Sequence, residues 1–232
     1  MPQPQRYTER LLLSALQTTD APLIYELHTN AAVQQYINRE QPEDERVSLV
    51  FIEKIQEGVQ KGRWFYWALR PKAAPEQLMG TICLWQFSDD RSSAEIGFDL
   101  LPQYQRQGFM QEALQDIIQF TAEALRLKTI VGIVNADNQP CIQLLTRNNF
   151  QFIHELPEEE KSDRLLGWTL ATALPQIECA LSHDGVKLIA NALGIGAAFG
   201  EVHNSGRLAP GLPQRPPGRF DKGRIDTNRG CI

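Results

Sequence analysis

The sequence lacks the long apolar stretches and paired cysteines that mark membrane and disulfide-linked proteins. No apolar run approaches the roughly 18 residues that span a bilayer. The first residues hold no apolar segment of about 7 to 15 residues, as a secretory signal does. The 4 cysteines have no CxxC or CxxH spacing, which argues against a zinc ribbon and a disulfide framework. We therefore expect a cytoplasmic protein with reduced thiols and no membrane partner.

Histidine is scarce, and acidic residues outnumber basic ones. The 4 histidines are scattered and form no cluster with cysteine or aspartate, so we expect no bound metal. The formal net charge of −5 argues against a general nucleic-acid binder, whose domain carries a basic face. Because 42% of the residues are hydrophobic and 22% are charged, the chain can bury a core, and wholesale disorder is excluded.

Glycine is unevenly distributed along the chain. Residues 1–174 hold 7 of the 16 glycines, whereas the last 58 residues hold 9. This shift predicts one folded domain at residues 6–174, a short helical extension at 175–199 and a flexible, basic, Gly- and Pro-rich tail at 200–232. Basic residues outnumber acids in the tail, so an arm that binds a partner is an alternative interpretation of it.

Hydrophobic periods of two and of 3.6 alternate within residues 6–174 and predict its elements. The first half predicts a strand at Glu9–Leu16, helical segments from Asp20 to Ile37, a helix from Asp44 with Val47, Phe51, Ile55 and Val59 on one apolar face, and three strands around 64–69, 81–85 and 94–99. The close spacing of these three strands indicates an antiparallel meander.

The second half predicts a parallel crossover. Its elements are a helix from Met110 to Leu125, a strand at Thr129–Val134, a helix from Asn138 to about Asn148, and strands near Gln151–Glu155 and Arg164–Thr172. The nearly continuous apolar run of the first of these strands indicates burial on both faces, which is typical of parallel pairing. We therefore expect a mixed α/β domain.

The stretch Ala94–Ala113, AEIGFDLLPQYQRQGFMQEA, carries the chemical information. A strand that runs into a polar loop before a helix leaves unpaired backbone N–H groups at the positive end of the helix dipole, where phosphate binds readily. Gly108 would allow close backbone approach, and Arg106 would add a charge-assisted contact. The spacing matches neither a P-loop nor a dinucleotide-binding fingerprint. An ordinary turn is the alternative.

The segment Gln105–Met110, QRQGFM, resembles the [QR]xxGx[GA] pyrophosphate motif of the GNAT N-acetyltransferases. Further blocks are similar to the branch typified by the ribosomal-protein N-terminal (alanine) acetyltransferases. These are TERLLL at Thr8–Leu13, AEIG at Ala94–Gly97 and NxxNxxCxxLLxRxxF at Asn135–Phe150. The blocks stand in the family's order and span about residues 8–172.

The resemblance implies a GNAT fold, an α/β domain with a mixed, mostly antiparallel sheet of about six or seven strands, splayed central strands and flanking helices. It implies acetyl-CoA as co-substrate and no metal. Met110, Asn149 and Cys141 depart from the family, which has a small residue, a glycine and a serine there. We expect Met110 to point into the core and Asn149 to keep a left-handed turn, which asparagine enters readily.

The resemblance also implies roles for individual residues. Glu95 would take the ammonium proton, and a structural ion pair is its alternative. The Asp99 N–H would bind the thioester carbonyl, the Leu101 backbone would bind the pantetheine, and Cys141 or Tyr104 would protonate the leaving thiolate. The remaining cofactor contacts would come from Gln105, Arg106, Gln107, Gly108, Phe109, Met110, Asn138 and Arg147. Core packing for Cys141, helix capping for Asn138 and a solvated charge for Arg147 are structural alternatives.

These inferences favour an N-acetyltransferase that moves acetyl from acetyl-CoA directly to a primary amine. At pH 7 an α-amine with a pKa near 8 is about 10% neutral, whereas a lysine amine is below about 0.1% neutral, so a protein N-terminus, for example of a ribosomal protein, is the leading acceptor. A small amine is the alternative acceptor, and a non-catalytic acyl-CoA-binding module is the alternative function. A monomer and a homodimer are both compatible with the sequence.

Overall fold

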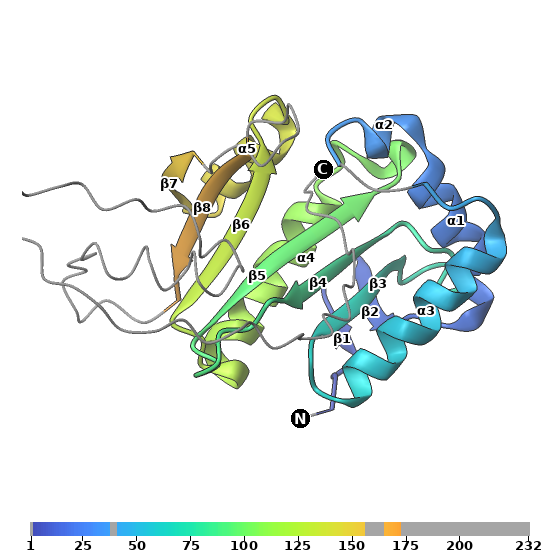
Figure 1. Ribbon diagram of the computed structural model, residues 1–232, viewed down its shortest axis with the longest axis horizontal. Helices are drawn as coiled ribbons and strands as arrows, with labels where there is room; N and C mark the ends of the chain where they lie inside the picture. The colour runs from blue at the N-terminus through green and yellow to red at the C-terminus, as the bar shows by residue number, and fades with distance from the viewer. Residues whose placement is uncertain (1, 38–40, 156–164, 173–232) are drawn as a thin grey trace, which may run out of the picture. The chain divides into compact units, whose positions relative to one another are not determined.

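The computed structural model describes residues 2–37, 41–155 and 165–172 of the chain (Figure 1). Its strands are β1 (Arg6–Tyr7), β2 (Leu11–Ala15), β3 (Phe65–Pro71), β4 (Gly80–Trp85), β5 (Ser93–Leu100), β6 (Thr129–Asn135), β7 (Gln151–Glu155) and β8 (Leu165–Ala171). Its α-helices are α1 (Ala21–Thr29), α2 (Ala31–Gln34), α3 (Glu45–Gln60), α4 (Phe109–Phe120) and α5 (Gln139–Arg147). The predicted extension at 175–199 and tail at 200–232 lie outside the described residues.

The strands form one eight-stranded sheet in the order β1-β2-β3-β4-β5-β6-β8-β7. Pairing is antiparallel except between β5 and β6, which are parallel. The predicted meander, the crossover through α4 and the mixed α/β class are therefore confirmed. The strand count exceeds the expected six or seven because β1 has only 2 residues, too few for a period of two to appear in the sequence.

The central strands β5 and β6 pair over only part of their length. Their ladder runs from Ser93 opposite Thr129 to Ile96 opposite Gly132. Beyond that point β5 continues to Leu100 and β6 to Asn135, and the two strands diverge, as Figure 1 shows. This confirms the predicted splay and opens the middle of the sheet between two strand ends.

Helices cover the two faces of the sheet and bury a separate core on each. On the first face, α4 and α5 pack on a cluster that includes Trp67, Leu69, Ile82, Phe98, Ile117 and Leu145. On the opposite face, α1, α2 and α3 pack on a cluster that includes Ile24, Leu27, Val33, Ile52, Ile55 and Ala68. We call these the α4 face and the α1–α3 face.

The buried side of α3 differs from the apolar face predicted for it. Val47 is 46% exposed, whereas Ser48 is 1% and Ile52 is 0% exposed. Gly58 is buried as well, and a Cβ there would lie 1.8 Å from Cζ2 of Trp64. The helix thus presents a serine and a glycine to its closest neighbours. A pattern that counts only apolar residues misses such a face.

Candidate active site

The loop between β5 and α4 has the backbone geometry of an anion site. Gly108 precedes α4 with a φ of 81°, and Arg106 is also left-handed, with a φ of 59°. Within the described part of the chain, the backbone N–H groups of Gln107, Gly108, Phe109 and Met110 find no hydrogen-bond acceptor. Such groups at a helix start are a ready binding place for phosphate.

Side chains of the loop hold it in this shape. Gln105 Nε2 donates to the Leu100 carbonyl at 2.9 Å, and Gln107 Nε2 donates to the Gln103 carbonyl at 2.6 Å. Both amides therefore stabilise the turn from within. The Arg106 side chain is exposed and can reach solvent or a ligand.

The first two residues of α4 have different surroundings. Met110 is 6% exposed and packs in the α4-face cluster, as expected for its departure from the family motif. Phe109 is half-buried, and the guanidinium carbon of Arg10 lies 4.4 Å from the centre of its ring. No pattern in the sequence indicates that Arg10 belongs to this site, because it is far from the loop along the chain.

Two acids lie on the same side of β5. Glu95 is 4% and Asp99 is 3% exposed. Because side chains alternate along a strand and Asp99 lies opposite Thr81 and hence Ala68, both acids belong to the α1–α3 face. Glu95 lies in the paired part of β5, opposite Val131, whereas Asp99 lies where β5 has left β6.

The Asp99 carboxylate belongs to a buried chain of hydroxyl groups. Thr81 Oγ1 donates to Asp99 Oδ1 at 2.5 Å, and the Tyr66 hydroxyl lies 3.1 Å from the same Thr81 oxygen. A buried carboxylate requires such donors. From the sequence, only the backbone of Asp99 was expected to take part. The hydroxyls come from β3 and β4, so only the strand register could reveal them.

Backbone hydrogen bonds within the chain already engage Leu101, the residue that follows β5. The Leu101 N–H donates to the Met79 carbonyl at 2.9 Å, and the Leu101 carbonyl accepts from the Tyr104 N–H at 2.9 Å. A pantetheine contact to the Leu101 backbone would therefore compete with bonds within the chain. The Tyr104 ring packs against both cores, and its hydroxyl accepts a hydrogen bond from Gln77 Nε2.

At the start of α5, Asn138 caps the helix and Cys141 packs in the core, which are the structural alternatives stated for these two residues. Asn138 is fully buried, and its Oδ1 accepts from the Cys141 N–H at 3.1 Å, which caps the helix. Cys141 is 0% exposed and belongs to the apolar cluster of the α4 face. Its side chain is therefore in the core opposite to the one that Glu95 and Asp99 face.

The other end of α5 lies beside the start of α4. The side-chain amides of Asn148 and Gln111 exchange two hydrogen bonds, at 2.8 and 2.9 Å. Arg147, the exposed neighbour of Asn148, is thereby brought to the end of α4 that carries the loop. Asn149 has a φ of 64°, which confirms the left-handed turn expected of it.

In residues 2–37, 41–155 and 165–172, His, Cys, Asp and Glu form no group of three that could hold a metal ion. Among the helices of these ranges, none has the length and apolar character needed to cross a membrane.

Known proteins share this sequence pattern and fold. A family model for the acetyltransferase (GNAT) domain matches residues 10–151. An uncharacterized N-acetyltransferase of Bacillus subtilis, YoaA, is 28% identical over 144 residues, which cover 62% of this chain and 81% of that protein.

Solved structures extend the comparison. RimL, a ribosomal L7/L12 alpha-N-protein acetyltransferase in complex with coenzyme A, is similar with a TM-score of 0.65 at 18% identity, over 72% of this chain and 96% of that one. Spermidine N-acetyltransferase from Vibrio cholerae, in complex with CoA and spermine, has a TM-score of 0.62 at 19% identity, over 70% and 96% of the two chains. At these identities the likeness establishes the fold.

Proposed function

This chain belongs to the GNAT acetyltransferase family and is an acyltransferase, and from that premise we propose that it transfers acetyl from acetyl-CoA to the α-amine of a protein N-terminus. The observation that carries the proposal is the row of N–H groups at Gln107–Met110, next to the strand ends that diverge. RimL and the spermidine acetyltransferase each hold coenzyme A on the same fold.

The residues of the loop fit the phosphates of acetyl-CoA. Four backbone N–H groups that have no acceptor among the described residues lie at the start of α4, where the helix dipole favours negative charge. Gly108 has no side chain to block the approach, and Arg106 and Arg147 are exposed cations at this end of α4. The cofactor itself supplies the thioester whose acetyl group is transferred.

The α1–α3 face supplies the groups for proton transfer. Glu95 is proposed to take the ammonium proton of the acceptor, because it is buried on the side of β5 that Asp99 shares. The Asp99 N–H is proposed to bind the carbonyl oxygen that becomes negative, a contact worth about 2.7 to 4 kcal/mol in other enzymes. Tyr104 is the better proposed donor to the thiolate, since Cys141 is enclosed by apolar side chains.

A protein α-amine suits this arrangement better than a lysine side chain does. At pH 7 about 10% of α-amines are already neutral, whereas below about 0.1% of lysine amines are. The α-amine therefore depends less on the base for loss of its proton. The two acids on β5 attract either amine, because both arrive largely as cations, so this attraction does not distinguish them. RimL is a ribosomal L7/L12 alpha-N-protein acetyltransferase, which supports the choice of a ribosomal N-terminus as the first acceptor to test.

The full chain tests the proposal directly. Labelled acetyl-CoA would be incubated with peptides that have free or blocked N-termini and, in parallel, with spermidine and free lysine. We expect label on free N-termini only, located by mass spectrometry of the peptide. Transfer to spermidine alone would identify a small-amine acetyltransferase, and CoA binding without transfer to any amine would identify a non-catalytic binding module.

Substituting Gly108 tests the cofactor site within the same assay. Gly108→Ala strains the left-handed turn by about 1 to 2 kcal/mol, and its Cβ would lie 3.3 Å from Arg10 Nη2. Gly108→Glu adds a negative charge at the proposed phosphate position. We expect Gly108→Glu to abolish CoA binding in calorimetry and Gly108→Ala to retain part of it, with both variants folded by circular dichroism. Equal affinities of wild type and Gly108→Glu would reduce the loop to an ordinary turn.

A further inference from the structure

One arginine of the segment between β1 and β2 reaches the last two residues of the β5–α4 loop and the first residue of α4. Arg10 Nη1 donates to the Gln107 carbonyl at 2.9 Å. Its Nη2 lies 3.3 Å from the place of a Cβ on Gly108, and its guanidinium covers the ring of Phe109. Arg10 precedes Gln107 by 97 residues. These contacts therefore do not arise within the loop motif itself and depend on the tertiary structure.

The contact with Gln107 determines where a neighbouring N–H points. The Gln107 carbonyl and the Gly108 N–H belong to one planar trans peptide, in which the two groups point in opposite directions. By holding the carbonyl, Arg10 directs the Gly108 N–H away from itself. The orientation of an anion-binding group is thus set by a side chain outside the loop.

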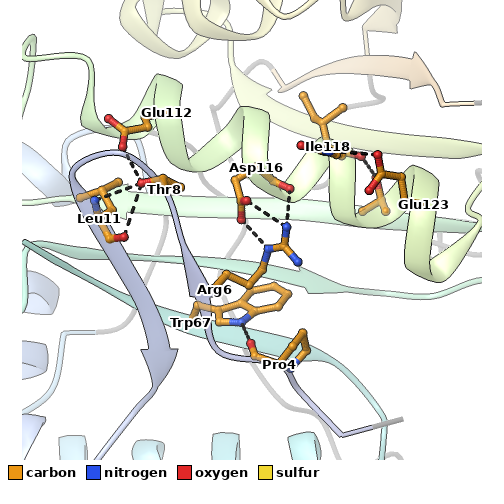
Figure 2. Close-up of polar contacts among 11 residues, drawn as sticks. Pro4, Arg6, Thr8, Leu11, Trp67, Glu112, Asp116, Ile118 and Glu123 are labelled. Carbon is orange, nitrogen blue, oxygen red and sulfur yellow. Dashed lines mark hydrogen bonds and ion pairs between the residues drawn. The ribbon is translucent and has the colours of Figure 1, made fainter. Parts of the chain in front are cut away.

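Arg10 also neutralises an acid in the first turn of α4. Glu112 Oε2 accepts from Arg10 Nε at 2.7 Å, and its Oε1 accepts from the Arg10 N–H at 2.7 Å. The same oxygen accepts from the Thr8 hydroxyl, as Figure 2 shows. Burial raises the pKa of Glu112, but the bonds from Thr8 and Arg10 and the Arg10 charge together hold that pKa below its ordinary value.

Glu112 is therefore ionised at neutral pH, close to the helix start where the phosphates are proposed to lie. An uncompensated carboxylate there would repel a pyrophosphate. We infer that Arg10 is a positioning residue of the proposed acetyl-CoA site, which orients the Gly108 N–H and cancels the charge of Glu112. This inference rests on the proposed function and adds to it a residue that needs no contact with the reacting atoms.

A matched control lies on the same segment and the same helix. Arg6 donates to Asp116 on α4 at 2.9 Å (Figure 2), and its guanidinium carbon lies 4.8 Å from the centre of the Phe120 ring. Arg6→Met and Arg10→Met therefore each remove an arginine–carboxylate pair and a ring contact from α4. Only Arg10 touches the loop.

The experiment compares both variants with two acetyl donors. Acetyl-CoA carries the pyrophosphate, and acetyl-pantetheine lacks it. For Arg10→Met we expect the Kd for CoA and the KM for acetyl-CoA to rise about 10- to 100-fold, the range for losing hydrogen bonds to a charged group. Its kcat/KM with acetyl-pantetheine should equal the wild-type value. Arg6→Met should lower Tm and leave both donors unaffected.

Two further variants complete the test. Arg10→Met/Glu112→Gln should recover part of the lost CoA affinity, because the uncompensated charge is gone. Should Arg10→Met not fold, Arg10→Lys keeps the charge but loses the planar fork, and we expect it to bind CoA several-fold more weakly than wild type.

The inference is overturned if the folded Arg10 variant binds CoA as wild type does, or if acetyl-pantetheine transfer falls as far as acetyl-CoA transfer. Failure of the wild-type protein to bind CoA would instead overturn the proposed function.

Discussion

The two faces of the sheet differ in the polar groups that they bury. The α4 face holds an apolar cluster in which the ring centres of Trp67 and Phe120 lie 5.7 Å apart. All four acids and arginines that are buried in the described residues lie on the α1–α3 face, namely Asp20, Arg70, Glu95 and Asp99. One face is thus built for packing, and the other accepts charge.

Charge is costly to bury unless partners compensate it, so the charged face requires an explanation residue by residue. Asp20 and Arg70 have one, since Arg70 Nη2 lies 2.6 Å from Asp20 Oδ2 and both side chains are almost fully buried. Glu95 and Asp99 lie on β5, the strand that diverges from β6 beyond Ile96, beside the proposed cofactor. We therefore predict that the buried Asp20–Arg70 pair stabilises the fold, whereas Glu95 and Asp99 serve the reaction.

The largest effect is expected from Glu95→Gln. Loss of a general base should lower kcat about 10²- to 10⁴-fold and leave the Kd for acetyl-CoA nearly unchanged. Raising the pH should restore part of the rate, because the acceptor amine then arrives neutral. The measurement is a pH profile of kcat with a free N-terminal peptide. Wild-type turnover by the variant at neutral pH would contradict the assignment.

Asp99→Asn is the control on the same strand face. Asparagine keeps an oxygen for the Thr81 hydroxyl and keeps the backbone N–H, so a smaller loss than for Glu95→Gln is expected, below about 10-fold. A larger loss, rescued by high pH, would transfer the role of base from Glu95 to Asp99.

The second effect concerns stability at the structural end of the same face. Asp20→Asn removes the charge that compensates Arg70 in the interior, and breaking a buried pair from one side costs about 3 to 5 kcal/mol. Urea unfolding should show this loss, while turnover per folded molecule stays normal. The double variant Asp20→Asn/Arg70→Met should recover much of the stability. A single variant as stable as wild type would show that the pair contributes little.

The third effect should appear on the α4 face. Ile117 is 0% exposed, and Ile117→Ala leaves a cavity that costs about 2 to 5 kcal/mol. Neither CoA affinity nor kcat per folded molecule should change, because Ile117 is two turns away from the loop. A fall in kcat comparable to that of Glu95→Gln would remove the functional distinction between the faces.

Local features of the site could be predicted because each of them depends on a short stretch of consecutive residues. Gly108 and Asn149 adopt the left-handed backbone that their residue types favour, and Asn138 caps the helix that follows it. The loop motif lies within six consecutive residues of the sequence, Gln105–Met110. Steric rules and helix-end hydrogen bonding act over such distances.

Other features depended on which segments meet. The buried side of α3 includes Gly58, which leaves room for the Trp64 ring. The Thr81–Asp99 contact depends on the register of β4 against β5. Each requires a knowledge of neighbours that periodicity does not contain.

The sequence by itself therefore determined the α/β class, the crossover, and the left-handed loop that is proposed to bind phosphate, since each depends on residues within about one element of each other. Only the tertiary structure decided that the buried charges gather on one face, and that Arg10 reaches Gln107 and Glu112 from 97 and 102 residues away. The physical reason is that chain folding, which buries apolar surface throughout the molecule, selects these distant pairs.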